Sequence, residues 1–145
     1  MDIVEITQVT DEVMDAFNRL VPQLSTSAAV PTRVELEDIA GSKASILLAA
    51  RDPQQNGKIV GSLTLVVFRI PTGVRAWIED VVVDTEERGK GIGEALTLAA
   101  LDRARVEGAK TVDLTSRPSR EAANRLYQRV GFQSRQTNLY RFDIK

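Results

Sequence analysis

The sequence predicts an α/β (α+β) fold with a mixed, mostly antiparallel central sheet of about seven strands and helices on both faces. Two observations predict this class. Runs rich in Val, Ile and Leu alternate with segments whose apolar residues recur at helical spacing, in the order β-α-α-β-β-β-α-β-α-β-β. In addition, a glycine-rich loop joins one apolar run directly to a helical segment, which is typical of α/β sheets.

In the first half of the chain, caps and periodicity indicate two helices between strands. Residues 3–9 alternate as a strand does, and Thr10 then offers an N-cap to a helix with apolar residues at helical spacing, namely Val13, Phe17, Leu20 and Leu24. Pro31-Thr32 opens a second, short helix that ends at a glycine. Two β-rich runs follow, at 44–51 and 58–70, on either side of a turn.

The second half of the chain should place a helix between two parallel strands. Residues 74–83 should return antiparallel to the preceding strand, because a Pro-Thr-Gly turn separates them. The helical segment 94–107 is apolar around more than half of its circumference, which suits a helix packed flat on a sheet. It leads by a right-handed crossover to a strand at 110–115. A helix at 120–130 and a final hairpin within 132–144 complete the predicted order.

Length and charge restrict the class of protein. A chain of 145 residues is expected to form a single domain, residues 1–145. With 19 basic and 20 acidic residues the net charge is −1, which argues against nucleic acid or an acidic membrane as a partner. There is no long apolar run, and Met1–Glu5 resembles no signal segment, so we expect a soluble, cytoplasmic protein.

The chain contains neither cysteine nor histidine, which restricts its chemistry. Disulfides, zinc sites built from Cys and His, and Cys-His or Ser-His nucleophile pairs are excluded, and we expect no metal. If the protein is an enzyme, its acid and base must come from Asp, Glu, Tyr, Lys or water. Direct transfer between two bound substrates is then the simplest course.

The loop Arg88-Gly89-Lys90-Gly91-Ile92-Gly93 predicts an anion site. Its glycines allow backbone N–H groups to converge, and the start of a helix adds roughly +0.5 of an elementary charge. The default ligand is therefore a phosphate or pyrophosphate. The loop is not a Walker A sequence, and Glu94 stands where the dinucleotide fingerprint needs its third glycine, although Asp113 lies at the spacing of that fold's ribose-binding acid. A glycine turn without a ligand is the remaining alternative.

Two motifs follow each other in the second half of the chain: the loop [R/Q]-x-x-G-x-[G/A] at Arg88–Gly93 and the motif A-x-x-L-Y-x-x-x-G-F at Ala123–Phe132. Taken together, they resemble the GNAT superfamily of acetyl-CoA-dependent N-acetyltransferases. The resemblance covers nearly the whole chain. It implies a direct transfer of acetyl from acetyl-CoA to a primary amine, of a small molecule or a protein, within a ternary complex. A catalytically weak module that senses acetyl-CoA is the alternative from another class.

The resemblance also implies which residues hold acetyl-CoA. The pyrophosphate would lie on the backbone of the loop residues Arg88, Gly89, Lys90, Gly91, Ile92 and Gly93. The pantetheine arm would bind the backbone of Val81, Val82 and Val83, in a cleft where the family's fourth and fifth strands splay apart. Many members carry asparagine seven residues before the motif tyrosine, where this chain has Arg120, so nearby Asn124 is carried over as the cofactor contact.

Two residues are candidates for proton transfer. Glu79 interrupts an apolar strand, and strand alternation predicts that it shares one face with Trp77, Val81 and Val83 while Asp80 points to the other. Glu79 is either the base that accepts the amine proton or an anchor for a cationic substrate. The family tyrosine, here Tyr127, lies near the thioester sulfur and protonates the leaving thiolate.

The acceptor is less well defined than the donor. Arg117 and Arg120 could hold an anionic acceptor or a CoA phosphate, or be a solvated surface pair, and Trp77 is a candidate for the acceptor pocket. The run Trp77–Val81 also looks like the corresponding strand of glucosamine-phosphate acetyltransferases, which leaves an amino sugar open. A homodimer is a further expectation, since dimers are common in the family.

Overall fold

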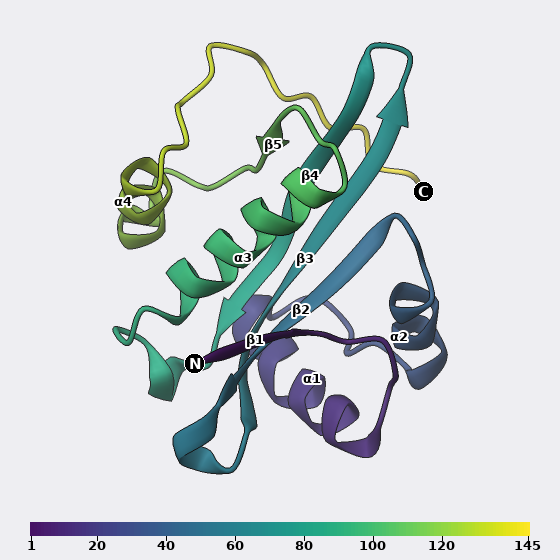
Figure 1. The fold of residues 1–145 in the computed structure, drawn as a ribbon, viewed down its shortest axis with the longest axis vertical. Helices are drawn as coiled ribbons and strands as arrows, with labels where there is room; N and C mark the ends of the chain where they lie inside the picture. Colours follow the sequence, from purple (N-terminus) through teal and green to yellow (C-terminus); the bar gives the residue numbers. More distant parts are fainter. The chain divides into compact units, whose positions relative to one another are not determined.

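The computed structural model describes all residues, 1–145, and Figure 1 shows its course. The chain divides into two compact units, Met1–Thr115 and Ser116–Lys145, which are described separately. The elements of the first unit are β1 (Asp2–Glu5), α1 (Asp11–Leu24), α2 (Arg33–Ala40), β2 (Ser45–Asp52), β3 (Lys58–Ile70), β4 (Gly73–Val83), α3 (Ile92–Val106) and β5 (Val112–Asp113), with short 3₁₀ turns η1 (Pro53–Gln55) and η2 (Thr85–Glu87). The second unit contains α4 (Glu121–Arg129).

The sheet is mixed and mostly antiparallel, as predicted, but it has five strands instead of about seven. Its strands lie in chain order, β1 to β4 antiparallel and β5 parallel to β4. The missing strands are those of the predicted hairpin within 132–144, where the structure has no strand. Residues 133–138 are all polar, so only one alternating run, 139–144, remains, and a hairpin needs two.

The helices of the first unit cover opposite faces of the sheet. Thr10 caps α1 by accepting a hydrogen bond from the Val13 amide at 3.3 Å. One core cluster joins this helix and α2 to the sheet through Val13, Ala16, Phe17, Leu20, Leu36, Leu47, Ala49, Ile59 and Val82. The helix α3 lies against the other face, where Ile92 and Leu96 approach Gly61. No helix is both long and apolar enough to cross a membrane.

A bulge in β4 corrects one prediction about which side chains share a face. Thr64 of β3 pairs with Glu79, whereas Ser62 pairs with Val82, so β4 has one extra residue in this interval. Asp80 lies in the bulge with φ of +51°, a left-handed conformation that Asp tolerates better than most residues. Trp77 and Glu79 do share a face, but the bulge puts Val82 on it in place of the predicted Val81 and Val83.

The strands β4 and β5 are paired over a short stretch only. Their ladder joins Ala76 to Val112 and Trp77 to Asp113, and β4 then continues to Val83 without β5 beside it. The strand predicted at 110–115 is therefore shorter, although Lys110 and Thr111 still exchange backbone hydrogen bonds with β4. As a result, the second half of β4 has a backbone edge that is free of β5.

Gly61 permits the close packing of α3 on the sheet. A Cβ at this position would lie 3.1 Å from the Val82 carbonyl oxygen and 3.2 Å from an Ile92 methyl carbon. We predict that Gly61→Ala lowers the free energy of unfolding by about 1–3 kcal/mol, because backbone and helix must move apart. Denaturant unfolding measures this, with Val34→Ala, 74% exposed on α2, as the control that should change stability by less than about 0.5 kcal/mol. Equal effects of the two changes would contradict the packing argument.

Candidate active site

The glycine loop forms an open cradle at the end of β4. Gly89 and Gly91 have φ of +82° and +78°, and an added Cβ at either would meet no atom within 4 Å. Gly91 is the N-cap of α3, which begins at Ile92, slightly before the predicted 94. The Ala95 amide makes the first intrahelical bond, to Gly91, so the amides of Ile92 and Gly93 point out of the helix start without a backbone partner. Such a site can bind a phosphate group.

The two basic side chains of the loop differ in their surroundings. Arg88 is exposed and makes no hydrogen bond or ion pair. Lys90, in contrast, lies with its Nζ 2.5 Å from Oε2 of Glu87, a residue only 7% exposed. The Lys90 ammonium and the Gln55 amide hold the pKa of the Glu87 carboxyl below its usual range. Because Lys90 is paired with Glu87, Arg88 is the loop residue whose positive charge is not compensated by a neighbouring carboxylate.

Glu79 lies just beyond the end of the β4–β5 ladder, two residues after Trp77, which still pairs with Asp113 of β5. The Glu79 carboxylate is exposed and has no hydrogen-bond or salt-bridge partner, and Trp77 is half-buried on the same face. Asp80, in the bulge, is also exposed and unpaired. A carboxylate without a partner can accept a proton or bind a cation, so the geometry suits both alternatives for Glu79.

The second unit contains the tyrosine and the arginines singled out in the sequence. Tyr127 is buried, its ring lies edge-on to Phe132 at a centroid distance of 5.7 Å, and its hydroxyl has no hydrogen-bond partner. Burial raises the pKa of Tyr127, against the opposing effect of the Arg120 charge, so the phenol is protonated at neutral pH. The guanidinium groups of Arg117 and Arg120 are exposed and unpaired.

Two side chains near these arginines have features that the motifs did not indicate. The Asn124 amide donates a 3.0 Å hydrogen bond to the Arg117 carbonyl, which ties α4 to the turn before it. The Ser116 hydroxyl is buried without any partner. No periodicity or spacing marks Ser116, because a lone serine after a strand is common, and only its burial distinguishes it.

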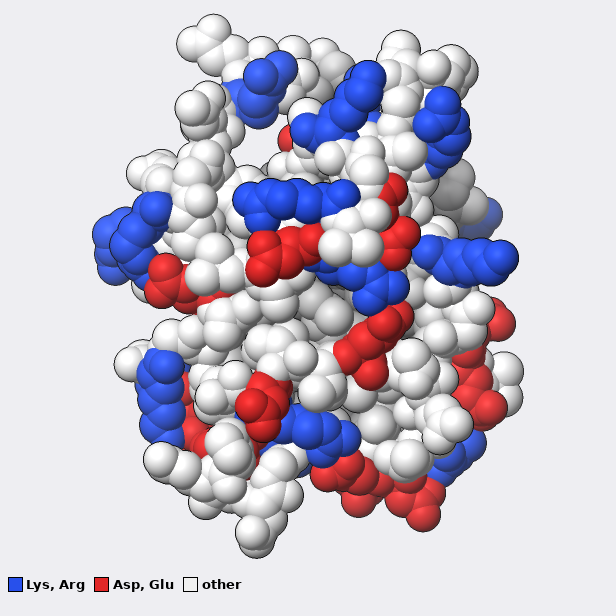
Figure 2. All heavy atoms as spheres, viewed as in Figure 1, with Lys and Arg blue, Asp and Glu red and all other residues white.

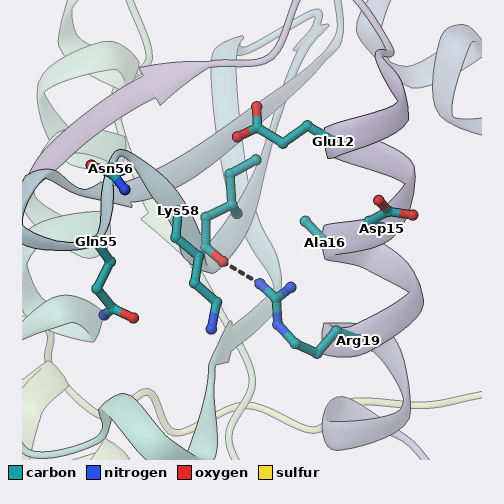
Figure 3. Close-up of a pocket in the computed structure, with 8 residues that line it drawn as sticks. Glu12, Asp15, Ala16, Arg19, Gln55, Asn56 and Lys58 are labelled. Atoms are coloured by element: carbon teal, nitrogen blue, oxygen red, sulfur yellow. Dashed lines mark hydrogen bonds between the residues drawn. The ribbon is translucent and has the colours of Figure 1, made fainter.

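A cavity of about 420 Å³ lies between α1 and the turn that joins β2 to β3, and none of the predicted site residues lines it. Figure 3 shows its walls, and the dashed line marks the bond from Arg19 to the Ile59 carbonyl. The lining residues are Glu12, Asp15, Ala16, Arg19, Gln55, Asn56, Lys58 and Ile59. They come from segments about 40 residues apart in the chain, so no local motif could predict the cavity.

The first unit is an α+β fold whose glycine cradle can bind a phosphate group and whose strand β4 presents an unpaired carboxylate. The chain belongs to the acetyltransferase (GNAT) family, whose sequence model matches residues 9–132. It is therefore an acetyl-CoA-dependent N-acetyltransferase, as the two motifs predict, and the prediction of fold class is confirmed except for the number of strands.

Individual relatives agree with this assignment. A glucosamine 6-phosphate N-acetyltransferase of Trypanosoma brucei brucei is 35% identical over 124 residues, which is 82% of each chain. An N-alpha-acetyltransferase 30 of Schizosaccharomyces pombe is 38% identical over 71 residues, 49% of this chain and 47% of that protein.

Solved structures share the fold over almost the whole chain. A Trypanosoma brucei acetyltransferase superposes with a TM-score of 0.78 at 26% identity and covers 99% of both chains. An aminoglycoside acetyltransferase from a soil metagenomic sample reaches a TM-score of 0.81 at 20% identity, with 99% and 96% covered, and at that identity it supports the fold alone.

Proposed function

We propose that the acceptor is the amino group of a phosphorylated amino sugar of the glucosamine 6-phosphate class. The observation that carries this proposal is the 35% identity, over 82% of both chains, to a glucosamine 6-phosphate N-acetyltransferase. The chemistry of the second unit supports it, since Arg117 and Arg120 have exposed, unpaired guanidinium groups. Guanidinium groups bind phosphate through paired hydrogen bonds.

We propose that the donor binds along the free half of β4 and the glycine loop. Val81, Val82 and Val83 follow the point where β4 and β5 part, so their outward N–H and C=O groups are available to the pantetheine arm. The amides of Ile92 and Gly93 and the charge of Arg88 fit the pyrophosphate. Asn124 is proposed as a further contact, although its amide is used within the second unit.

In the proposed reaction, Glu79 and Tyr127 transfer the two protons. A primary amine must lose its proton before attack, which costs about 4.6 kcal/mol at pH 7 for an amine with a pKa near that of lysine, about 10.4. The cost is smaller for an amino sugar, because the oxygens beside its amine make that amine less basic. Glu79 accepts this proton, directly or through water. The amine nitrogen then bonds to the acetyl carbonyl carbon as the carbon–sulfur bond breaks. Tyr127 donates its phenolic proton to the sulfur, a transfer that is uphill by at least about 2 kcal/mol and that proximity can offset. The second proton, which the nitrogen loses as the amide forms, passes through water to the Tyr127 phenolate, so that one proton in total is left on Glu79.

We also propose that residues 1–145 act as a single domain in the cytoplasm and that the chain forms a homodimer. Support for the dimer comes from the C-terminal segment, in which Leu139, Tyr140, Phe142 and Ile144 are all exposed. Four large apolar side chains exposed in so short a segment favour contact with another chain.

An acetyl-transfer screen tests the choice of acceptor. The panel comprises glucosamine 6-phosphate, glucosamine, polyamines, amino acids and N-terminal peptides, and thiol release from acetyl-CoA is the readout. We predict a kcat/KM for glucosamine 6-phosphate at least about tenfold above that for glucosamine, because the phosphate adds charge-assisted hydrogen bonds. A preference for peptides or polyamines would overturn the amino sugar proposal. Binding of acetyl-CoA without turnover of any amine would favour the sensor.

Replacing the strand carboxylate tests the base. We predict that Glu79→Gln lowers kcat/KM by about a hundredfold near neutral pH, because the amide cannot accept the amine proton. The loss should shrink as the pH rises toward the pKa of the amine, since more of the acceptor is then already neutral. The matched control is Asp80→Asn in the adjacent bulge, which should retain activity within about twofold. A constant loss at every pH would indicate a substrate anchor instead of a base.

Removing one hydroxyl tests the acid. We predict that Tyr127→Phe lowers kcat by about tenfold or more while the KM for acetyl-CoA stays within about twofold, because the phenol acts on the departing sulfur. Tyr140→Phe, at a tyrosine 86% exposed, serves as the control and should behave like the unmodified enzyme. If kcat of Tyr127→Phe is unchanged, the tyrosine has a packing role only.

A further inference from the structure

The segment that leads into the glycine loop is held at its start by α1. Asp84, 3% exposed, accepts a hydrogen bond at 3.2 Å from Nε of Arg19, and Arg19 also donates to the Ile59 carbonyl. Thr85 donates through both its amide and its hydroxyl to Oε1 of Gln23, at 2.8 and 3.1 Å. The N-terminal end of η2 is therefore fixed to a helix that is itself part of the core.

The other end of η2 is held by the turn between β2 and β3. Gln55 is the link, because its Nε2 donates to Oδ2 of Asp52 at 2.7 Å and to Oε1 of Glu87 at 2.9 Å. The second oxygen of Glu87 receives the Lys90 ammonium at 2.5 Å. One chain of hydrogen bonds thus runs from the turn, through Glu87, to the middle of the glycine loop.

Gln55 separates two carboxylates that would otherwise repel each other. Asp52 and Glu87 are both 7% exposed, and although Lys90 and Gln55 lower the pKa of Glu87 overall, the negative charge of Asp52 opposes this lowering. The hydrogen bond from Gln55 lowers the pKa of Asp52, as it does that of Glu87. A neutral side chain with two N–H donors satisfies both acids at once. Without it, two nearly buried carboxylates would be left facing each other.

The loop needs such an anchor because it makes few contacts of its own. Gly89 and Gly91 have open space around them, and glycine at these φ values has more conformational freedom than any other residue. The shape of residues 88–91 is consequently set by its two ends, α3 on one side and Glu87 on the other.

We propose that Gln55 is a positioning residue for acetyl-CoA: through Glu87 and Lys90 it keeps the glycine loop in the conformation that receives the pyrophosphate. The inference rests on the proposed role of the loop in binding that group. Pre-organisation of this kind reduces the entropy lost on binding, so its removal weakens affinity without touching the chemistry. Gln55 itself makes no hydrogen bond to the candidate base or to the loop backbone.

The test compares neighbouring glutamines of one turn. We predict that Gln55→Ala raises the Kd for acetyl-CoA about tenfold, as expected for a lost hydrogen bond to a charged group, while kcat and the acceptor KM stay within about twofold. Gln54→Ala is the matched control, because Gln54 is exposed and its side chain makes no hydrogen bond. Titration calorimetry measures Kd, and thermal unfolding confirms that each variant is folded.

A size-matched variant and a loop variant make the outcome decisive. Gln55→Glu keeps the volume but has no N–H donor, so it should weaken acetyl-CoA binding more than Gln55→Ala does, and it also serves if the alanine variant does not fold. Gly91→Ala tests the loop itself. If Gly91→Ala weakens binding and both Gln55 variants bind like Gln54→Ala, the positioning role is wrong. If Gly91→Ala leaves Kd unchanged, the proposed role of the loop fails, and the inference fails with it.

Discussion

The structure depends on the fact that β4 is fully paired on one side and only briefly paired on the other. Its ladder with β3 runs the length of the strand, while β5 joins it at Ala76 and Trp77 alone. Beyond Trp77 the outward N–H and C=O groups of β4 have no partner on β5, so this edge offers a row of backbone donors and acceptors. Glu79 lies on this half of β4, and the glycine cradle follows the end of the strand. The candidate base and the candidate donor site are therefore both positioned by β4.

Most of the fold was predictable because its helices and strands are built from regular periodicities. The caps at Thr10 and the pattern of α1, the long strand at 58–70 and the loop before α3 were all found from the sequence alone. The bulge at Asp80 was not, because nothing in an alternating apolar run marks one residue as extra, and the faces of Val81 and Val83 were therefore assigned wrongly. The prediction of a final hairpin was wrong, because residues 132–144 contain only one alternating apolar run and a hairpin needs two.

Candidate site residues could be named from the sequence only where a motif or an interrupted strand pattern marked them. The loop and Tyr127 belong to motifs, whereas Gln55, Asp52 and Glu87 meet through hydrogen bonds between segments far apart in sequence. The distribution of charged side chains is likewise a matter of local pairs. Acidic and basic side chains lie next to one another over much of the face seen in Figure 2, in keeping with a net charge of −1. Local pairs such as Glu87 with Lys90 therefore shape the field near the loop more than any overall excess does.

The cavity beside α1 has a consequence for how the loop could be controlled. Arg19 and Gln55, which hold opposite ends of η2, both line this cavity of about 420 Å³ (Figure 3). A molecule that filled it would touch both holding points at once, one reaching Asp84 and the other Glu87. Thermodynamic linkage is reciprocal, so whatever factor such a molecule imposed on acetyl-CoA affinity, acetyl-CoA would impose on the molecule. Arg19 and Gln55 therefore connect the walls of this cavity to both ends of η2, the segment that leads into the glycine loop.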